Sequence, residues 1–355
     1  MYQDTYAEID LNRLIDNIDY VYSKANKPLM AIVKANAYGH GYQEVVNAIK
    51  NHPYISMFGV ARLQEAISIR KLGVSQDILV LGAVPVDEIN DAIKYNISLS
   101  LFSFDYLEDL KAYHHSDQPL KVHIKLDTGM NRIGFKGKEE FQRVLSLLDE
   151  RFFLEGVFTH FATADMPSKI DEYHKQMDLF HELTEGLDLK YIHCQNSASM
   201  IFHKEDKTNL GRIGIVMYGI DPGDDENPHL KQVMSLYSSV SMVKIVPKGE
   251  KIGYGMTYQT PEDEYIATIP IGYADGFIRA NSGRHVYING KYYQIVGRIC
   301  MDQMMVRVDE TIKVHDKVEI FGDHISISSM AKDLNTIGYE IPCILTERVK
   351  RVYKK

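Results

Sequence analysis

A single lysine, Lys34, ends an apolar run of strand type and is followed at once by a short turn with Gly39 and Gly41. Burying a lysine in a strand is unfavourable, because taking its ammonium group out of water is costly and lowers the pKa. The same loss of water would make the amine neutral and reactive, as covalent binding of an aldehyde cofactor requires. The run therefore predicts either a lysine that binds pyridoxal phosphate (PLP) or a strand-end lysine whose ammonium group reaches solvent.

Further polar residues stand at or just after later apolar runs. They are Lys125, Asp127, Arg132, His160, Asn196, Ser197, Arg212 and Gly214. Each alone is weak evidence, but together they would bring an amine, an imidazole and two guanidiniums to one place. The backbone N–H groups of Gly214 and Ile215, with the hydroxyls of Tyr38 and Ser197, could hold a phosphate there. Ser197 could equally cap a helix.

The elements that would bring these residues together are apolar runs that alternate with amphipathic segments of helical length. After a short opening strand over residues 6–11, strands are expected over residues 29–33, 57–61, 78–81, 97–101, 122–126, 154–158, 191–193 and 215–218. Repeated strand and helix units of this number and size predict a (β/α)8 barrel, in which catalytic groups come from the carboxyl ends of the strands. A doubly wound open sheet is the alternative, because periodicity does not report closure.

A polar stretch rich in turn-forming residues, 221–228, marks a change of character. Beyond it the runs are short and rich in Val, Ile, Tyr and Thr, with strands expected over residues 238–246, 265–269, 285–288, 292–296, 304–308 and 318–320. The sequence thus predicts a barrel domain over residues 1–225 and a mostly β domain over residues 226–355.

Composition narrows the class of protein. The 355 residues carry a net charge of -8, which argues against nucleic acid as the main partner. No apolar run has the length of a membrane span, and the N-terminus lacks a signal pattern, so a cytoplasmic protein without a membrane partner is expected. Three widely spaced cysteines, Cys194, Cys300 and Cys343, fit a reducing compartment and offer no metal site.

The stretch 31–41 around Lys34 resembles the PLP-lysine signature of alanine racemases. The stretches around the later polar residues resemble that family in order and spacing, as do 253–258, 271–276 and 297–303 in the second region. The resemblance covers almost the whole chain. It implies a PLP-binding barrel followed by a β domain, in a homodimer with shared active sites. The implied activity interconverts L-alanine and D-alanine and supplies D-alanine for peptidoglycan.

The resemblance also implies catalytic roles. Lys34 would bind PLP and act as one of two bases at Cα, and Tyr254 would be the other base, reaching in from the second subunit. Racemisation needs bases on opposite faces, because the proton leaves one face and returns to the other. Arg212 would face the pyridine nitrogen and keep it unprotonated, which favours racemisation over transamination. His160 would stack on the ring and hydrogen-bond to Arg212.

Other residues acquire roles by the same resemblance. Arg132 and the backbone of Met301 would receive the substrate carboxylate. Lys125 would be carbamylated, as in many members of the family, or would form a plain ion pair. The implied cofactor contacts, besides those above, are Tyr38, Asn196, Ser197, Gly214 and Ile215. The residues that would line the substrate access path are Asp165, Tyr273, Arg279, Arg298 and Asp302.

One position departs from the family pattern, and three alternatives stay open. Glu347 stands where some members carry a tyrosine that contacts the phosphate, which leaves the preference for alanine unsettled. The first alternative is a racemase of serine or another amino acid on the same scaffold. The second is a decarboxylase, against which Arg212 argues. The third is a PLP-binding protein without turnover, against which Tyr254 argues.

Overall fold

The computed structural model describes residues 5–203, 207–223 and 227–355. The described residues form two compact units. The barrel unit holds residues within 15–217 and 221–230, and the β-rich unit holds the residues up to Leu14 together with 218–220 and 231–355. Among these residues, no helix is long and apolar enough to cross a membrane.

The barrel unit is built on a parallel sheet of eight strands in the order β8-β7-β6-β5-β4-β3-β2-β9. The strands are β2 (Leu29–Ile32), β3 (Ile55–Val60), β4 (Asp77–Val80), β5 (Ser98–Leu101), β6 (Leu120–Lys125), β7 (Phe152–Phe158), β8 (Tyr191–His193) and β9 (Gly211–Ile213). The two end strands are linked by backbone hydrogen bonds from Asn209 to Ile192 and from Arg212 to Gln195. The sheet therefore closes into a near-complete barrel, and the expected (β/α)8 architecture is confirmed.

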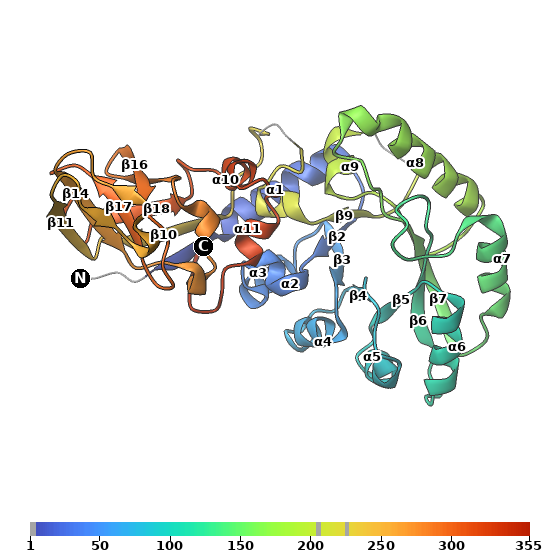
Figure 1. Cartoon of the computed structure of the whole chain (residues 1–355). Helices are drawn as coiled ribbons and strands as arrows, with labels where there is room; N and C mark the ends of the chain where they lie inside the picture. The colour runs from blue at the N-terminus through green and yellow to red at the C-terminus, as the bar shows by residue number, and fades with distance from the viewer. Residues whose placement is uncertain (1–4, 204–206, 224–226) are drawn as a thin grey trace. The chain divides into compact units, whose positions relative to one another are not determined.

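Helices follow the strands and lie outside them. They are α2 (Lys34–Tyr38), α3 (Tyr42–Ile49), α4 (Leu63–Lys71), α5 (Ile89–Lys94), α6 (Phe104–Tyr113), α7 (Gly137–Leu147), α8 (Ile170–Thr184) and α9 (Ser197–Phe202). Figure 1 shows α4 to α8 on the outer side of β3 to β7. Each longer helix buries one stripe, as α3 does with Val45, Val46 and Ile49. The strands are covered on both faces, which explains their nearly continuous apolar runs.

The prediction of the eighth barrel strand at residues 215–218 is wrong. Ile215–Tyr218 forms the 3-10 helix η3, and the strand β9 lies just before it at Gly211–Ile213. The four residues of η3 are fully buried. A short buried apolar run has the same composition in a strand and in a helical turn, so its pattern does not distinguish them. As a consequence, Arg212 lies inside the last strand and not ahead of it.

The β-rich unit contains a nine-stranded sheet in the order β11-β14-β17-β16-β15-β18-β10-β1-β19. The strands are β1 (Tyr6–Asp10), β10 (Met234–Ser239), β11 (Met242–Val246), β14 (Glu264–Ile269), β15 (His285–Ile288), β16 (Lys291–Val296), β17 (Met304–Val308), β18 (Lys317–Phe321) and β19 (Lys350–Lys354). A small hairpin pairs β12 (Lys251–Ile252) with β13 (Tyr258–Gln259), and two short helices are α10 (Ile327–Asp333) and α11 (Glu340–Cys343). The mostly β character of this region is confirmed.

The single strand expected over residues 238–246 is wrong, because this run forms parts of β10 and β11. The chain breaks at Val240 and Ser241, whose N–H groups donate to the carbonyls of Asp316, just before β18, and of Thr268 in β14. The run contains no Gly or Pro to signal the break.

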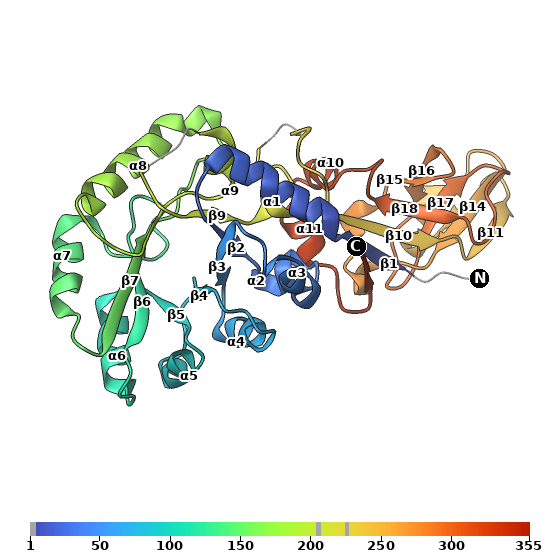
Figure 2. The same ribbon diagram turned by 180° about the vertical axis from the view of Figure 1, so that it is seen from behind.

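The first strand of the chain belongs to the β-rich unit. Figure 2 shows β1 beside β10, with which it pairs antiparallel, and β1 also pairs parallel with β19 near the C-terminus. The inward residues Ala7 and Ile9 are fully buried. The expected barrel domain of residues 1–225 included this strand, whereas the structure places the strand in the β-rich unit.

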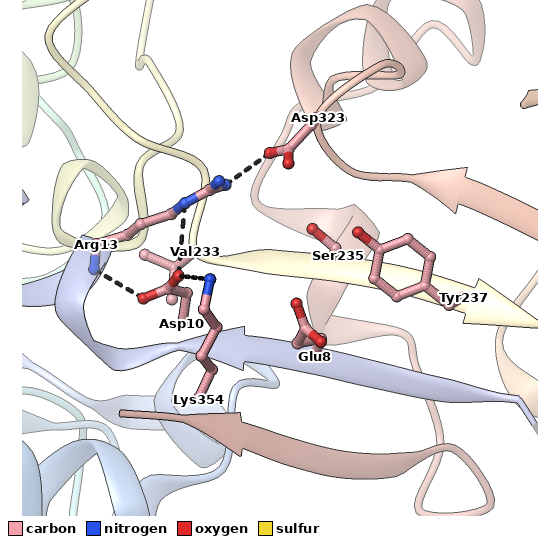
Figure 3. A pocket seen from close by; sticks show the side chains of 8 residues that line it. All are labelled: Glu8, Asp10, Arg13, Val233, Ser235, Tyr237, Asp323 and Lys354. Atoms are coloured by element: carbon pink, nitrogen blue, oxygen red, sulfur yellow. Dashed lines mark hydrogen bonds and ion pairs between the residues drawn. The ribbon is translucent and has the colours of Figure 1, made fainter. Parts of the chain in front are cut away.

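A shallow polar pocket of the β-rich unit holds paired charges (Figure 3). Arg13 contacts Asp323 at 2.7 Å, and Lys354 contacts Asp10 at 3.1 Å. Burial alone would raise the pKa of Asp10, but hydrogen bonds from the Arg13 backbone and from Lys354 outweigh it and lower the pKa. The Lys354–Asp10 pair joins β19 to β1, and the Arg13–Asp323 pair joins the start of α1 (Leu11–Ala25) to the turn after β18, so we assign the pocket a structural role.

Candidate active site

The segment α2 is not an ordinary helix, because the residues after Lys34 form a left-handed turn at the carboxyl end of β2. Ala35, Asn36, Ala37 and Tyr38 have φ values of 52°, 55°, 53° and 52°. This conformation costs an L-residue about 1 to 2 kcal/mol, or about 4 to 8 kcal/mol for the four. Such strain persists only where the surroundings hold it, and it concentrates at functional sites. Lys34 lies just after the end of β2 and immediately before this turn.

Strand register brings Lys34 close to the end of β9. The two strands are neighbours, with Met30 opposite Arg212 and Ala31 opposite Ile213. Gly214, which follows β9, therefore lies beside the end of β2, where the left-handed turn begins.

Two hydroxyls meet the backbone at Gly214. The Gly214 N–H group donates to Ser197 Oγ at 3.0 Å. A Cβ atom at Gly214 would lie 2.8 Å from the Tyr38 hydroxyl oxygen, so only glycine leaves room for this approach. Tyr38, Ser197 and Gly214, which the sequence predicts to hold a phosphate, thus lie together at this point.

The guanidinium of Arg212 is buried and fixed by backbone carbonyl groups. Nη1 donates to the His193 carbonyl at 3.1 Å, and Nη2 donates to the carbonyls of Thr159 and Cys194 at 2.9 and 3.0 Å. Nη2 also lies 3.2 Å from His160 Nδ1. Because a guanidinium only donates, His160 accepts at Nδ1. The predicted contact between Arg212 and His160 is present.

His160 lies in a strongly positive environment. Its pKa is held well below the usual value, chiefly by burial and then by the positive charges of Arg212, Arg132, Lys125 and Lys34. The imidazole is therefore neutral. Lys34, Lys125, Arg132 and Arg212 are therefore all near enough to His160 to lower its pKa.

Lys125, the last residue of β6, is a buried amine. Burial first, and then the charges of Arg212 and Arg132, lower its pKa to about 7. Its Nζ donates to the Leu126 carbonyl at 2.6 Å. Part of the population is thus a free amine at neutral pH, which is the form that reacts with carbon dioxide.

A buried chain of side chains extends from Arg212 into the barrel and was not predicted from the sequence. Arg212 Nη1 lies 3.1 Å from His193 Nδ1, His193 Nε2 lies 3.0 Å from His123 Nδ1, and His123 Nε2 lies 3.4 Å from Glu155. Gly156 leaves room for His123, because a Cβ there would lie 2.6 Å from its ring. The available signal was the presence of histidines inside two apolar strands.

The positions of the protons along these hydrogen-bonded side chains follow from Arg212, which can only donate. Arg212 donates to His193 Nδ1, so a neutral His193 carries its proton on Nε2 and donates to His123, which in turn donates to Glu155. Burial lowers the pKa of both histidines, with the charge of Arg212 acting further on His193. Burial would raise the pKa of Glu155, but hydrogen bonds from His123 and Ser98 lower it to about 2. An ionised carboxylate thus ends the chain.

The remaining predicted residues of the barrel unit lie on its loops. Arg132 is exposed in the loop after β6, where Asp127 accepts N–H groups of Gly129 and Asn131. Asn196, not Ser197, is the N-cap of α9 and accepts from the Ser199 N–H group at 3.0 Å. Ile215 opens η3 and is buried, and Asp165 is exposed in the loop after β7.

The predicted residues of the β-rich unit gather on neighbouring loops of that unit. Tyr254 lies in the turn between β12 and β13, and a Cβ at Gly255 would lie 2.8 Å from Arg298 Nη1. The loop with Tyr273 is bound to the loop with Met301, because Ala274 N–H donates to the Met301 carbonyl at 3.0 Å.

These loops expose large apolar side chains. Tyr254 is 70% exposed and Met301 is 52% exposed. Arg279 and Glu347 are also exposed. Asp302 pairs with Arg348 at 2.8 Å, which ties the Met301 loop to the C-terminal segment.

These features define a (β/α)8-type barrel with several cationic side chains gathered near the carboxyl ends of its strands, which is where barrel enzymes carry their active sites. Two sequence families match the chain: "Alanine racemase, N-terminal domain" over residues 9–222 and "Alanine racemase, C-terminal domain" over residues 233–353. The chain belongs to the alanine racemase family, a family of PLP-dependent isomerases. The resemblance stated from the sequence is confirmed.

Relatives and solved structures agree over the full length. The alanine racemase of Halalkalibacterium halodurans is 44% identical over 99% of this chain and 95% of its own. Alanine racemase 1 of Bacillus subtilis is 42% identical over 99% and 93%. The crystal structure of alanine racemase from E. faecalis has a TM-score of 0.94 at 37% identity, covering 99% and 98% of the two chains. That from Bacillus anthracis with bound L-Ala-P has a TM-score of 0.92 at 35% identity, covering 100% and 96%.

Proposed function

We propose that this chain racemises alanine with PLP held at the carboxyl ends of the barrel strands. The observation that carries the proposal is the Arg212 guanidinium, which three backbone carbonyls and two histidines fix beside the end of β2. When bound to an amino acid, PLP withdraws electrons from Cα and so weakens its C–H bond.

The residues present fit this cofactor. Lys34 would hold its aldehyde, and Tyr38, Ser197 and the backbone of Gly214 and Ile215 would hold its phosphate. The close approach of the Tyr38 hydroxyl to Gly214 supports this assignment. Asn196 caps the helix that carries Ser197 and would lie at the edge of the same phosphate site.

Arg212 and His160 would set the electronic environment. Arg212 carries a fixed positive charge and donates hydrogen bonds, so it would present a donor to the pyridine nitrogen and keep a proton off it. The cofactor would then withdraw electrons less strongly, which would favour racemisation over transamination. His160 is neutral, so it would pack on the ring without adding charge.

Proton transfer at Cα would use two bases on opposite faces. Lys34 would serve one face and Tyr254 of a second copy of the chain the other. The exposure of Tyr254 and of its neighbour Met256 supports a surface that another chain covers. Arg132 and the Met301 backbone would receive the substrate carboxylate.

Several further assignments belong to the same proposal. Tyr273, Arg279, Arg298, Asp302 and Asp165 would line the access path, and their exposure or loop position supports this. The low pKa of Lys125 supports its carbamylation, which would add a negative charge near Arg132. We further propose that the chain acts in the cytoplasm, where it would supply D-alanine for peptidoglycan; three widely spaced cysteines suit a reducing compartment.

Replacement of Lys34 by alanine tests the cofactor assignment. The purified wild-type chain should show the absorbance of covalently bound PLP, and Lys34→Ala should lose it. Lys138→Ala, an exposed lysine of α7, is the matched control and should keep it. A normal cofactor spectrum in the Lys34 variant would reject the assignment.

A further inference from the structure

We propose that Glu65 is a positioning residue for the candidate site, because its carboxylate clamps the left-handed turn that follows Lys34. Oε1 accepts from the Ala35 N–H group at 2.7 Å. Oε2 accepts from the N–H groups of Ala61 and Arg62 at 2.9 and 3.1 Å. One carboxylate thus collects three backbone donors from two segments.

The two segments are the ends of neighbouring barrel strands. Ala35 follows Lys34 at the end of β2, whereas Ala61 and Arg62 follow β3, and β2 pairs with β3 in the sheet. The last backbone bond between the two strand ends runs from Val33 to Gly59 at 3.0 Å. Beyond that bond, Glu65 joins the two ends.

A simpler role for Glu65 is helix capping, but capping does not explain its contact with Ala35. Glu65 is the third residue of α4, whose N-cap is Arg62. A glutamate at this position commonly accepts the N–H group of the N-cap residue. Capping needs only that contact, whereas the contact with Ala35 holds the first residue of the left-handed turn.

The other end of the turn is fastened separately. Asn36 Oδ1 accepts from the Tyr42 N–H group at 2.9 Å. His40 is fully buried, and its Nδ1 lies 3.1 Å from the Ala37 carbonyl and 2.9 Å from the Tyr38 carbonyl. Since carbonyls only accept, Nδ1 carries the proton and donates.

The clamp has a consequence for the site. Non-glycine residues leave the left-handed region when nothing holds them there. Without Glu65, the Ala35 end of the turn would relax, and the backbone that fixes Lys34 directly before it would lose its anchor. This consequence rests on the proposed function, whereas the clamp itself does not.

Hydrogen exchange of the full-length, cofactor-free chain tests the clamp directly. In Glu65→Gln an amide N–H group replaces one acceptor, so amides of residues 35–38 should exchange at least about ten-fold faster, as expected for loss of a bond to a charged group. Glu139→Gln is the matched control, because Glu139 is the exposed third residue of α7. Faster exchange confined to residues 61–66 would show a cap only and would overturn the proposal.

A second variant covers a failure of Glu65→Gln to fold. Glu65→Asp keeps the charge and the capping contact but is one methylene shorter, so it should still release Ala35. Its exchange at residues 35–38 should rise while residues 61–66 stay protected. Unchanged exchange at residues 35–38 in this variant would contradict the clamp.

Titration with PLP tests the positioning role. Each folded Glu65 variant should bind PLP at least about ten-fold more weakly than the Glu139 control, with a shifted pH midpoint of the bound cofactor's absorbance. A loosened turn with unchanged PLP affinity would overturn the positioning role. Failure of the wild-type chain to bind PLP would instead reject the proposed function and leave the exchange result to decide on the clamp.

Discussion

The buried amine of Lys125 gives the structure a measurable pH dependence, which Lys125→Met should remove. The pKa of about 7 lies about 3.5 below the ordinary value of 10.5, which at 1.36 kcal/mol per pKa unit corresponds to about 5 kcal/mol. Methionine is also unbranched and only one atom shorter than lysine, but it carries no charge. The free energy of unfolding therefore reports the cost of burying the ammonium group.

The direction of the effect follows from proton binding. Between pH 7 and pH 10.5 the unfolded chain binds more protons at Lys125 than the folded chain, so stability should rise with pH across this window. Below pH 7 both states are protonated, and the full penalty of burial applies. Lys125→Met should be the more stable protein at neutral pH, and the contribution of Lys125 to the pH slope should vanish in it.

Urea unfolding in carbonate-free buffer measures this slope, with Lys138→Met as the exposed control. At pH 7 about half of Lys125 is a free amine, roughly a thousand-fold more than for a lysine of ordinary pKa. Labelled bicarbonate should therefore give a carbamate signal in wild type that Lys125→Met lacks. Equal pH slopes in wild type and Lys125→Met would refute the buried-amine reasoning, and the absence of the signal would refute carbamylation.

Two further substitutions test other parts of the account. His123→Leu should destabilise the protein by about 1 to 3 kcal/mol, because it leaves the buried His193 Nε2–H group without its acceptor. Urea unfolding measures this effect, with the exposed His115→Leu as the control. Equal unfolding midpoints for the two variants would contradict the hydrogen bonds from Arg212 to Glu155. Tyr254→Phe should slow deuterium exchange at Cα of L-alanine by about 10²- to 10⁴-fold, but that of D-alanine far less; Tyr265→Phe is the control, and equal losses for both enantiomers would reject the assignment of the two faces.

The sequence predicts the barrel and the strand-end positions of several candidate site residues because both depend on local pattern. Apolar runs of strand length, each followed by a polar residue, located Lys34, Lys125 and His160 at strand ends. The parallel topology then brings those ends to one side, which needs no knowledge of the side-chain contacts.

Other features depend on contacts that local pattern does not encode. In the Ala-Asn-Ala-Tyr sequence of residues 35–38 only Asn36 favours the left-handed region. A turn of four such residues requires Glu65 and His40 from outside the segment. The chain from Arg212 to Glu155 joins β9, β8, β6 and β7 through side chains inside the barrel. The pairing of β1 with β19 joins opposite ends of the sequence.

The most direct test of the central claim is chiral analysis of the product from L-alanine in deuterated water, run beside a panel of other L-amino acids. The account predicts that D-alanine forms with deuterium at Cα, that alanine is the preferred substrate and that Lys34→Ala abolishes the reaction. Preferential turnover of L-serine would move the assignment to another racemase on the same scaffold. Absence of any D-amino acid product from wild-type protein with bound PLP would contradict the proposed function.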